Sequence, residues 1–169
     1  FVLFIKSRKR LVTSASESVL NNLKEFVVEV KTNPSLALLV LLTGGIEILG
    51  FSTMALMPSI ARDVLGLGAD GLGLIQSVGA VGGMGAVVVL ALAGEIRRRG
   101  LVFLVTLVVF GAGLVWLGQS SSLLMVLAAI VVVNATMAIT DVLSQGLMQS
   151  VVPNEQRGRA AGAWQVAVG

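Results

Sequence analysis

Two acidic side chains lie inside stretches of the chain that are otherwise largely apolar. Glu47 falls near the middle of residues 35–57, and Asp141 falls within residues 123–149. A charged residue at the centre of a bilayer costs roughly 2.5–3.5 kcal/mol on insertion scales, and neither stretch contains a basic residue. Low dielectric favours the protonated form of a carboxylic acid, so these groups can bind and release protons. The alternatives are that they hold a cationic substrate or pair with an arginine elsewhere in the protein.

A stripe of polar residues accompanies Asp141. The side chains at positions 134, 141, 145 and 149 are separated by seven, four and four residues, so they share one face of a helix. Such a face cannot meet lipid with its groups unpaired, and it must face other helices or water. This polar face either forms hydrogen bonds between helices or lines a substrate pathway. The candidate cavity-lining residues are Thr43, Asn134, Gln145 and Gln149.

Composition places the chain among membrane proteins. Hydrophobic residues make up 56% and charged residues 12%, and the mean hydropathy is +0.95. The chain has no histidine or cysteine, which excludes disulfides, thiol chemistry and Cys/His metal sites. It also has no nucleophile motif and no phosphate-binding loop. We therefore expect no metal, no cofactor and no enzymatic activity.

Four complete membrane spans are expected in an all-α fold. They cover residues 35–57, 71–94, 101–117 and 123–149, and the first of them, at about 1.5 Å per residue, covers the roughly 30 Å of the hydrocarbon core. Partial spans are expected at residues 1–5 and from about residue 160. Because the chain begins at Phe1, we expect it to be part of a longer protein. Pro58 is expected to end the first complete span, with a loop over residues 59–70.

Residues 6–34 form a cytoplasmic loop in this scheme. Within it, Ser14–Glu17 fits a capping box, and apolar residues then recur at helical spacing up to Lys31. This amphipathic helix is too polar to span a membrane, so we expect it on the membrane surface or against the bundle. Asn33-Pro34 interrupts the helical pattern.

The basic residues determine the expected orientation. Three gaps between apolar runs hold 11 of the 12 basic residues, and the alternate gaps hold only Arg62. The positive-inside rule places the basic gaps in the cytoplasm. The excess of basic residues, a net charge of +3, is therefore explained by membrane topology, and we expect no nucleic-acid partner.

The second span is rich in glycine. Gly79 and Gly83 are four residues apart, and Gly82 has the same relation to Ala86. These small-xxx-small patterns allow two helices to approach closely. They indicate either static helix packing or a contact that slides during transport.

Three stretches give the chain a resemblance to a known family. They are GFSTMALMPSIARDVLG with GLG (50–66 and 71–73), GEIRRRG (94–100) and VPNEQRGRA (152–160). Together they resemble the second half of a major facilitator superfamily transporter, in the branch of enterobactin-exporter-like and macrolide-efflux-like permeases. The likeness runs from the end of helix six to the start of helix eleven.

This resemblance implies a twelve-helix fold of two six-helix halves, with a central cavity worked by rocking. The chain would be the C-terminal half, and the N-terminal half would be its partner. In the family, the loop between helices eight and nine carries a cytoplasmic gate, which matches Glu95, Arg97 and Arg98 here. The acid follows Gly94 directly instead of four residues later, so positive-inside anchoring is the alternative. The further gate or anchor candidates are Arg157 and Arg159.

From these observations we expect a multi-pass protein of the bacterial inner membrane. It would export a small molecule, either a drug-like compound or a siderophore, by proton antiport with alternating access. Its partners would be membrane lipids, the substrate, protons and the missing N-terminal half. Two alternatives are a scaffold or sensor on a transporter-like fold that transports nothing, and a truncated half-transporter without function.

Overall fold

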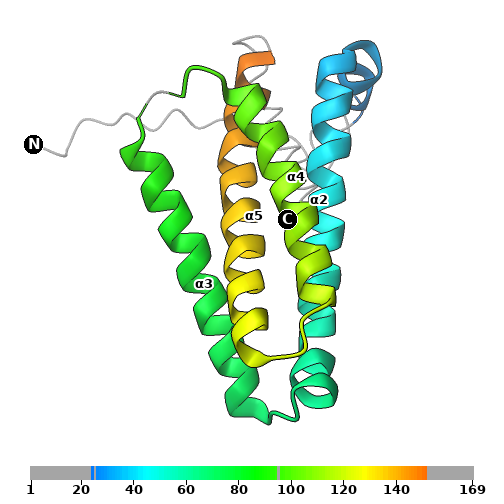
Figure 1. Cartoon of the computed structure of the whole chain (residues 1–169). Coiled ribbons are helices and arrows are strands. Elements are labelled where there is room, and N and C mark those ends of the chain that lie inside the picture. The colour runs from blue at the N-terminus through cyan, green and yellow to red at the C-terminus, as the bar shows by residue number, and fades with distance from the viewer. Residues whose placement is uncertain (1–23, 25, 95, 152–169) are drawn as a thin grey trace, which may run out of the picture.

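The computed structural model describes residues 24, 26–94 and 96–151, and every regular element within them is a helix (Figure 1). The elements are α2 (Pro34–Ser59), the π-helix η1 (Ile60–Val64), α3 (Ala69–Leu92), α4 (Arg99–Gly118) and α5 (Leu123–Val151). Four helices are long and apolar enough to cross a membrane. The expected all-α membrane fold is therefore confirmed. The expected partial spans, at residues 1–5 and from about residue 160, lie outside the described residues.

The four long helices alternate in direction along the chain (Figure 1). The start of α2, the end of α3, the start of α4 and the end of α5 lie at one end of the bundle. Lys31 directly precedes α2 and the run Arg97–Arg99 leads into α4, so these basic residues lie at that end, whereas Arg62 belongs to η1 beyond the end of α2. The positive-inside rule predicts that the first of these ends faces the cytoplasm.

The start of α2 is set by local hydrogen bonding. The Asn33 side chain accepts hydrogen bonds from the backbone N–H groups of Ser35 and Leu36, at 3.2 and 3.3 Å, and Pro34 occupies the first helical position. Residues 26–32 form a separate helical segment. Its Phe26 and Val30 pack against the buried residues at this end of the bundle. The rest of the expected amphipathic helix, residues 14–23 and 25, lies outside the described residues.

Pro58 does not end the first span, and our expectation on this point was wrong. The residue lies inside α2, and the chain continues as η1, where the Leu65 N–H donates to the Ile60 carbonyl at 3.1 Å. A proline in the last turn removes only one backbone donor, which wider turns beyond it tolerate. The helical path ends at Gly66, whose φ of 64° is readily adopted by glycine.

The central helix is α5, which packs against α2, α3 and α4 (Figure 1). Three groups of buried apolar side chains follow it along the bundle, and each includes residues of α5. The first contains Leu36, Leu39, Phe103, Leu143 and Met148. The second contains Ile46, Phe110 and Val133. The third contains Met57, Ala61, Ile75, Leu117, Val126, Ala129 and Ile130.

The glycines of α3 lie against α5. A Cβ atom at Gly82 would stand 3.0 Å from the Val131 Cα and 3.1 Å from the Val131 carbonyl oxygen. A Cβ at Gly79 would stand 2.9 Å from the Asn134 side-chain nitrogen, and one at Gly83 would stand 3.5 Å from the Asn134 carbonyl oxygen. Missing side chains therefore allow the two backbones to approach closely.

Candidate functional site

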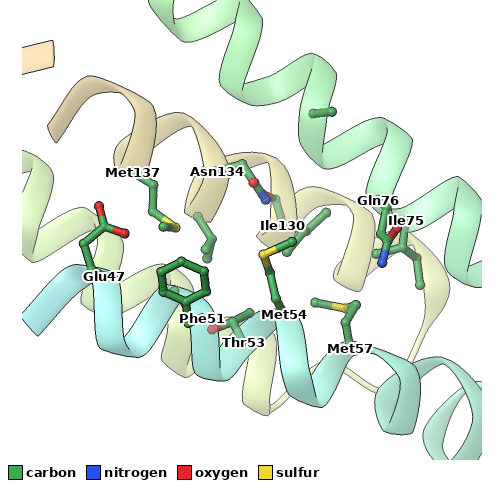
Figure 2. A pocket seen from close by; sticks show the side chains of 13 residues that line it. Glu47, Phe51, Thr53, Met54, Met57, Ile75, Gln76, Ile130, Asn134 and Met137 are labelled. Atoms are coloured by element: carbon green, nitrogen blue, oxygen red, sulfur yellow. The ribbon is translucent and has the colours of Figure 1, made fainter. Parts of the chain in front are cut away.

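A cavity of about 290 Å³ lies between α2, α3 and α5 (Figure 2). Both α2 and α3 pack on α5, which leaves room between them for this cavity. Its lining consists of Glu47, Gly50, Phe51, Thr53, Met54, Met57, Ile75, Gln76, Ala80, Ile130, Val133, Asn134 and Met137. We call it the central pocket.

The lining residues share one face of each helix because of their spacing in the sequence. The lining residues of α2 recur every three or four positions from Glu47 to Met57, and those of α5 do so from Ile130 to Met137. At Gly50 a Cβ atom would overlap the Met137 thioether, so the flexible Met137 side chain would have to turn aside. The absent side chain of Gly50 therefore lets Met137 line the pocket.

The pocket is mainly apolar and contains no basic residue. Eight of the thirteen lining residues are apolar, namely three methionines, two isoleucines, a phenylalanine, a valine and an alanine. The polar side chains are those of Glu47, Thr53, Gln76 and Asn134, and only Glu47 is ionisable. Glu47 lies at one end and Gln76 near the other, with Asn134 between them (Figure 2). The pocket is therefore an apolar chamber with a carboxylate at one end.

The two acids expected to act chemically are brought together. The carboxyl groups of Glu47 on α2 and Asp141 on α5 lie close enough to interact electrostatically. Both residues are partly buried, and Asp141 lies outside the set that lines the pocket. Within the described part of the chain, neither acid has a basic partner. We call Glu47 and Asp141 the acid pair.

Asn134 is held by its own helix. Its side-chain nitrogen donates to the Ile130 carbonyl at 3.0 Å, which fixes the amide beside the pocket. Among the described residues, nothing donates a hydrogen bond to its side-chain oxygen. The amide therefore keeps an acceptor that a bound molecule can use.

The other predicted lining residues lie elsewhere. Thr43 does not line the central pocket, and its hydroxyl is buried without a hydrogen-bond partner among the described residues. Gln145 is exposed and does not line the pocket. Gln149 belongs to α5, but its side chain is not described. The structure thus brings together Glu47, Asp141 and Asn134 from the sequence-predicted polar residues.

The predicted gate residues are only partly described. Arg97 and Arg98 are exposed just before α4, whereas Glu95, Arg157 and Arg159 lie outside the described residues. The adjacent Arg99 lines a second cavity of about 320 Å³ between α3, α4 and α5. Its guanidinium lies beside Gly146 of α5. Sequence reasoning missed Arg99, because nothing in a run of three arginines distinguishes one from the next.

Several residues of the central pocket were also missed from the sequence. Phe51, Met57 and Met137 are apolar residues in apolar spans, so their types carry no signal of a site. Gln76 did offer a signal, because it is a lone amide in a span dominated by glycine and aliphatic residues. Applying the argument used for Asn134 to this amide would have identified Gln76.

Residues 1–169 match the family model described as the Major Facilitator Superfamily. Searches of curated proteins and of solved structures give no significant match.

Proposed function

The chain belongs to the Major Facilitator Superfamily, and from this membership we propose that it acts in a secondary active transporter that exports a small molecule by proton antiport. The superfamily is one of transporters, and the four apolar helices make the chain a multi-pass membrane protein. The proposed location is the bacterial inner membrane. The observation that carries the proposal is the acid pair, of which Glu47 also lines one end of the central pocket.

The acid pair suits proton coupling because its members belong to different helices. Two carboxylates close together repel each other when both are ionised, and binding one proton relieves that repulsion. The repulsion depends on how closely α2 and α5 approach at this level. Proton binding and the arrangement of the two helices are therefore linked, as a proton-driven conformational cycle requires.

The shape and lining of the central pocket favour a small-molecule substrate. Ligand sites are commonly concave, mostly apolar and equipped with a few polar groups, and the central pocket has each of these properties. The proposed direction, export, rests on the resemblance of three loop stretches to the enterobactin-exporter-like and macrolide-efflux-like branch. In this proposal the substrate is a drug-like compound or a siderophore.

The test is transport by the protein that the complete gene encodes. The gene is expressed in a bacterial host without its major efflux pumps, and resistance is measured across a panel of drugs, with siderophore export as a separate assay. We expect wild-type protein to raise resistance or export for at least one compound. A protonophore should abolish that effect, and Glu47→Gln and Asp141→Asn should each reduce it at least tenfold.

Asp63→Asn is the matched control, because Asp63 is exposed in η1 and lies outside the central pocket. This variant should behave as wild type. Export that continues unchanged in the double variant of the acid pair would contradict proton coupling through these residues. Failure to export any compound, despite normal expression in the membrane, would contradict the transport proposal itself.

A further inference from the structure

The cavity of about 320 Å³ between α3, α4 and α5 has no residue in common with the central pocket. It is lined by the end of α3, the start of α4 and the part of α5 from Val142 to Gly146. These segments lie at the end of the bundle that the positive-inside rule predicts to face the cytoplasm, where α3 leans away from α5 (Figure 1). We call it the Arg99 cavity.

The charge of the Arg99 cavity is opposite to that of the central pocket. Arg99 is the one ionisable residue of its lining. The side chain is exposed, its guanidinium lies 3.7 Å from where a Cβ atom at Gly146 would stand, and it has no acidic partner within the described part of the chain. A guanidinium presents parallel N–H groups that match the oxygens of a phosphate or carboxylate. The cavity therefore favours an anion.

The backbone at the start of α4 adds to this preference. Arg99 is the first residue of α4, and no side chain among the described residues caps this helix. The Val102 N–H donates to the Arg98 carbonyl at 3.1 Å, so the N–H groups that precede Val102 in α4 have no acceptor in the helix. Free N–H groups and the positive end of the helix dipole attract anions. The side chain of Arg99 and the end of its helix thus favour negative charge in the same region.

The remaining side chains of the lining are aliphatic. Val87 of α3 and Val142 of α5 line the cavity and are nevertheless 40% and 44% exposed, so the cavity opens at the surface of the bundle. Leu92 of α3 and Leu101 of α4 are exposed nearby in the sequence. In a membrane, an apolar surface of this kind meets acyl chains. A molecule that fills the cavity therefore needs both a negative charge and an apolar part.

We propose that the Arg99 cavity binds an anionic phospholipid of the cytoplasmic leaflet. The lipid phosphate lies against the Arg99 guanidinium, and an acyl chain runs past the aliphatic lining into the bilayer. Basic pockets between membrane helices on the cytoplasmic side suit anionic headgroups. This inference names a partner and a site beyond the proposed transport function, and it does not depend on that function.

The charges at this end of the bundle also select among phospholipids. Arg97 and Arg98 are exposed beside Arg99 in the sequence, and no acid lines the cavity. Phosphatidylcholine carries a cation beside its phosphate, and that cation would find no partner in the lining. Phosphatidylglycerol carries the phosphate without a cation. A free phosphate ion would leave the aliphatic lining without contacts.

The test is lipid binding by the purified and delipidated complete gene product, measured by native mass spectrometry. Dioleoyl phosphatidylglycerol and dioleoyl phosphatidylcholine are titrated separately, because they share acyl chains and differ in headgroup charge. We expect the first phosphatidylglycerol to bind with a Kd at least tenfold lower than that of phosphatidylcholine. Arg99→Gln should raise the Kd for phosphatidylglycerol at least fivefold. Gly146→Leu should also raise it, because a leucine side chain would fill part of the cavity.

Two variants control for the change of charge and of volume. Arg98→Gln removes the same charge from the same run of arginines, but Arg98 does not line the cavity, so the Kd should change less than twofold. Gly85→Leu adds the same side chain to α3 outside the cavity, at a position where nothing lies within 4 Å of a Cβ atom. It should bind phosphatidylglycerol as the wild type does.

Equal affinity of the wild type for the two lipids, or equal effects of Arg98→Gln and Arg99→Gln, would overturn the inference. Displacement of phosphatidylglycerol by an equal concentration of inorganic phosphate would also overturn it, because the cavity would then recognise a free anion. The headgroup comparison uses the wild-type protein, so it stands even if a variant fails to fold. Lipid binding needs neither substrate nor proton gradient, so this proposal and the transport proposal fail separately.

Discussion

The roles that Glu47 and Asp141 can take depend on which residues surround them in the folded chain. Taken singly, each is an acid in an apolar helix and therefore costly to insert into a membrane. In the folded chain they meet across α2 and α5, and Glu47 also faces the central pocket. The Glu47 side chain thus faces both a second carboxylate and a cavity. This double placement is what makes Glu47 the most informative residue to substitute.

Four buried threonine hydroxyl groups lie at a similar height in the helix bundle. Thr43, Thr106, Thr136 and Thr140 are all buried. Along their own helices they fall between the apolar cluster that contains Phe103 and the one that contains Phe110. The Thr140 hydroxyl donates to the Thr106 hydroxyl at 3.4 Å, whereas the Thr43 hydroxyl has no hydrogen-bond partner in the part of the chain that the structure describes.

This difference predicts opposite effects of the same substitution. Thr43→Val should leave the thermal stability of the purified protein unchanged or raise the free energy of unfolding by about 1 kcal/mol, because a buried hydroxyl without a partner is removed. Thr140→Val should lower it by about 1 kcal/mol, because a buried hydrogen bond is lost. The measurement is the melting temperature in detergent. A lower melting temperature for Thr43→Val than for Thr140→Val would show that the Thr43 hydroxyl is satisfied.

At the scale of elements, α5 is the helix on which the others assemble. It reaches α3 through glycines, α4 through Gly113 beside Val133, and α2 through Gly50 beside Met137. Each contact depends on a side chain that is absent. The packing of this bundle is therefore more sensitive to added volume than to the loss of a particular polar contact.

Two glycines of α3 provide a matched test of this packing. Gly82→Leu should lower the melting temperature by several degrees, because its Cβ meets the backbone of Val131, which cannot move aside as a flexible side chain can. Gly85→Leu should have little effect or raise stability, because nothing lies within 4 Å of a Cβ there and leucine favours the helix. Equal destabilisation by both variants would contradict the close approach of α3 and α5.

The end of the first helical unit gives a prediction of its own. Gly66 has φ of 64°, so Gly66→Ala should reduce the free energy of unfolding by about 1 kcal/mol. Gly68→Ala is the control, because Gly68 has φ of −82° and nothing lies within 4 Å of a Cβ there. Chemical or thermal denaturation of both variants measures the difference. Similar stability of the two would mean that the turn after η1 adopts another conformation.

At the scale of the whole molecule, the question is whether the central pocket opens to each side of the membrane in turn. The chain has no cysteine, which allows single cysteines to be introduced cleanly. Cysteines at Met54 and Asn134 should react with a membrane-impermeant thiol reagent from one side, and the reactive side should change with pH or with a candidate substrate. The measurement is labelling of right-side-out and inside-out vesicles.

A cysteine at Val108 serves as the control, because this exposed residue of α4 lies on an apolar surface away from the pocket. It should remain unlabelled under all conditions. Protection of Met54 and Asn134 positions from both sides under every condition would contradict alternating access. It would favour the alternative of a membrane scaffold or sensor that transports nothing.

Much of the fold could be predicted because membrane insertion imposes simple constraints. Long apolar runs must form helices that satisfy their own backbone groups, so the four spans are readable from hydropathy. Pro58 was the exception, since its effect depends on how neighbouring turns adjust. The sequence marks site residues only where a polar side chain is costly to place in a membrane span, as at Glu47, Asp141 and Asn134. The apolar residues that line the pocket carry no such signal.

The sequence by itself determined the class of molecule, the number of long helices and the positions at which a polar group must serve some purpose. These follow from the free energy of transferring each residue into lipid, which is a local property. Only the tertiary structure decided that Glu47 lies near Asp141, that methionines from α2 and α5 line one pocket, and that Thr43 is buried outside it. Those relations depend on how the helices rotate and approach, and the close approach of α3 to α5 is set by contacts between residues far apart in the chain.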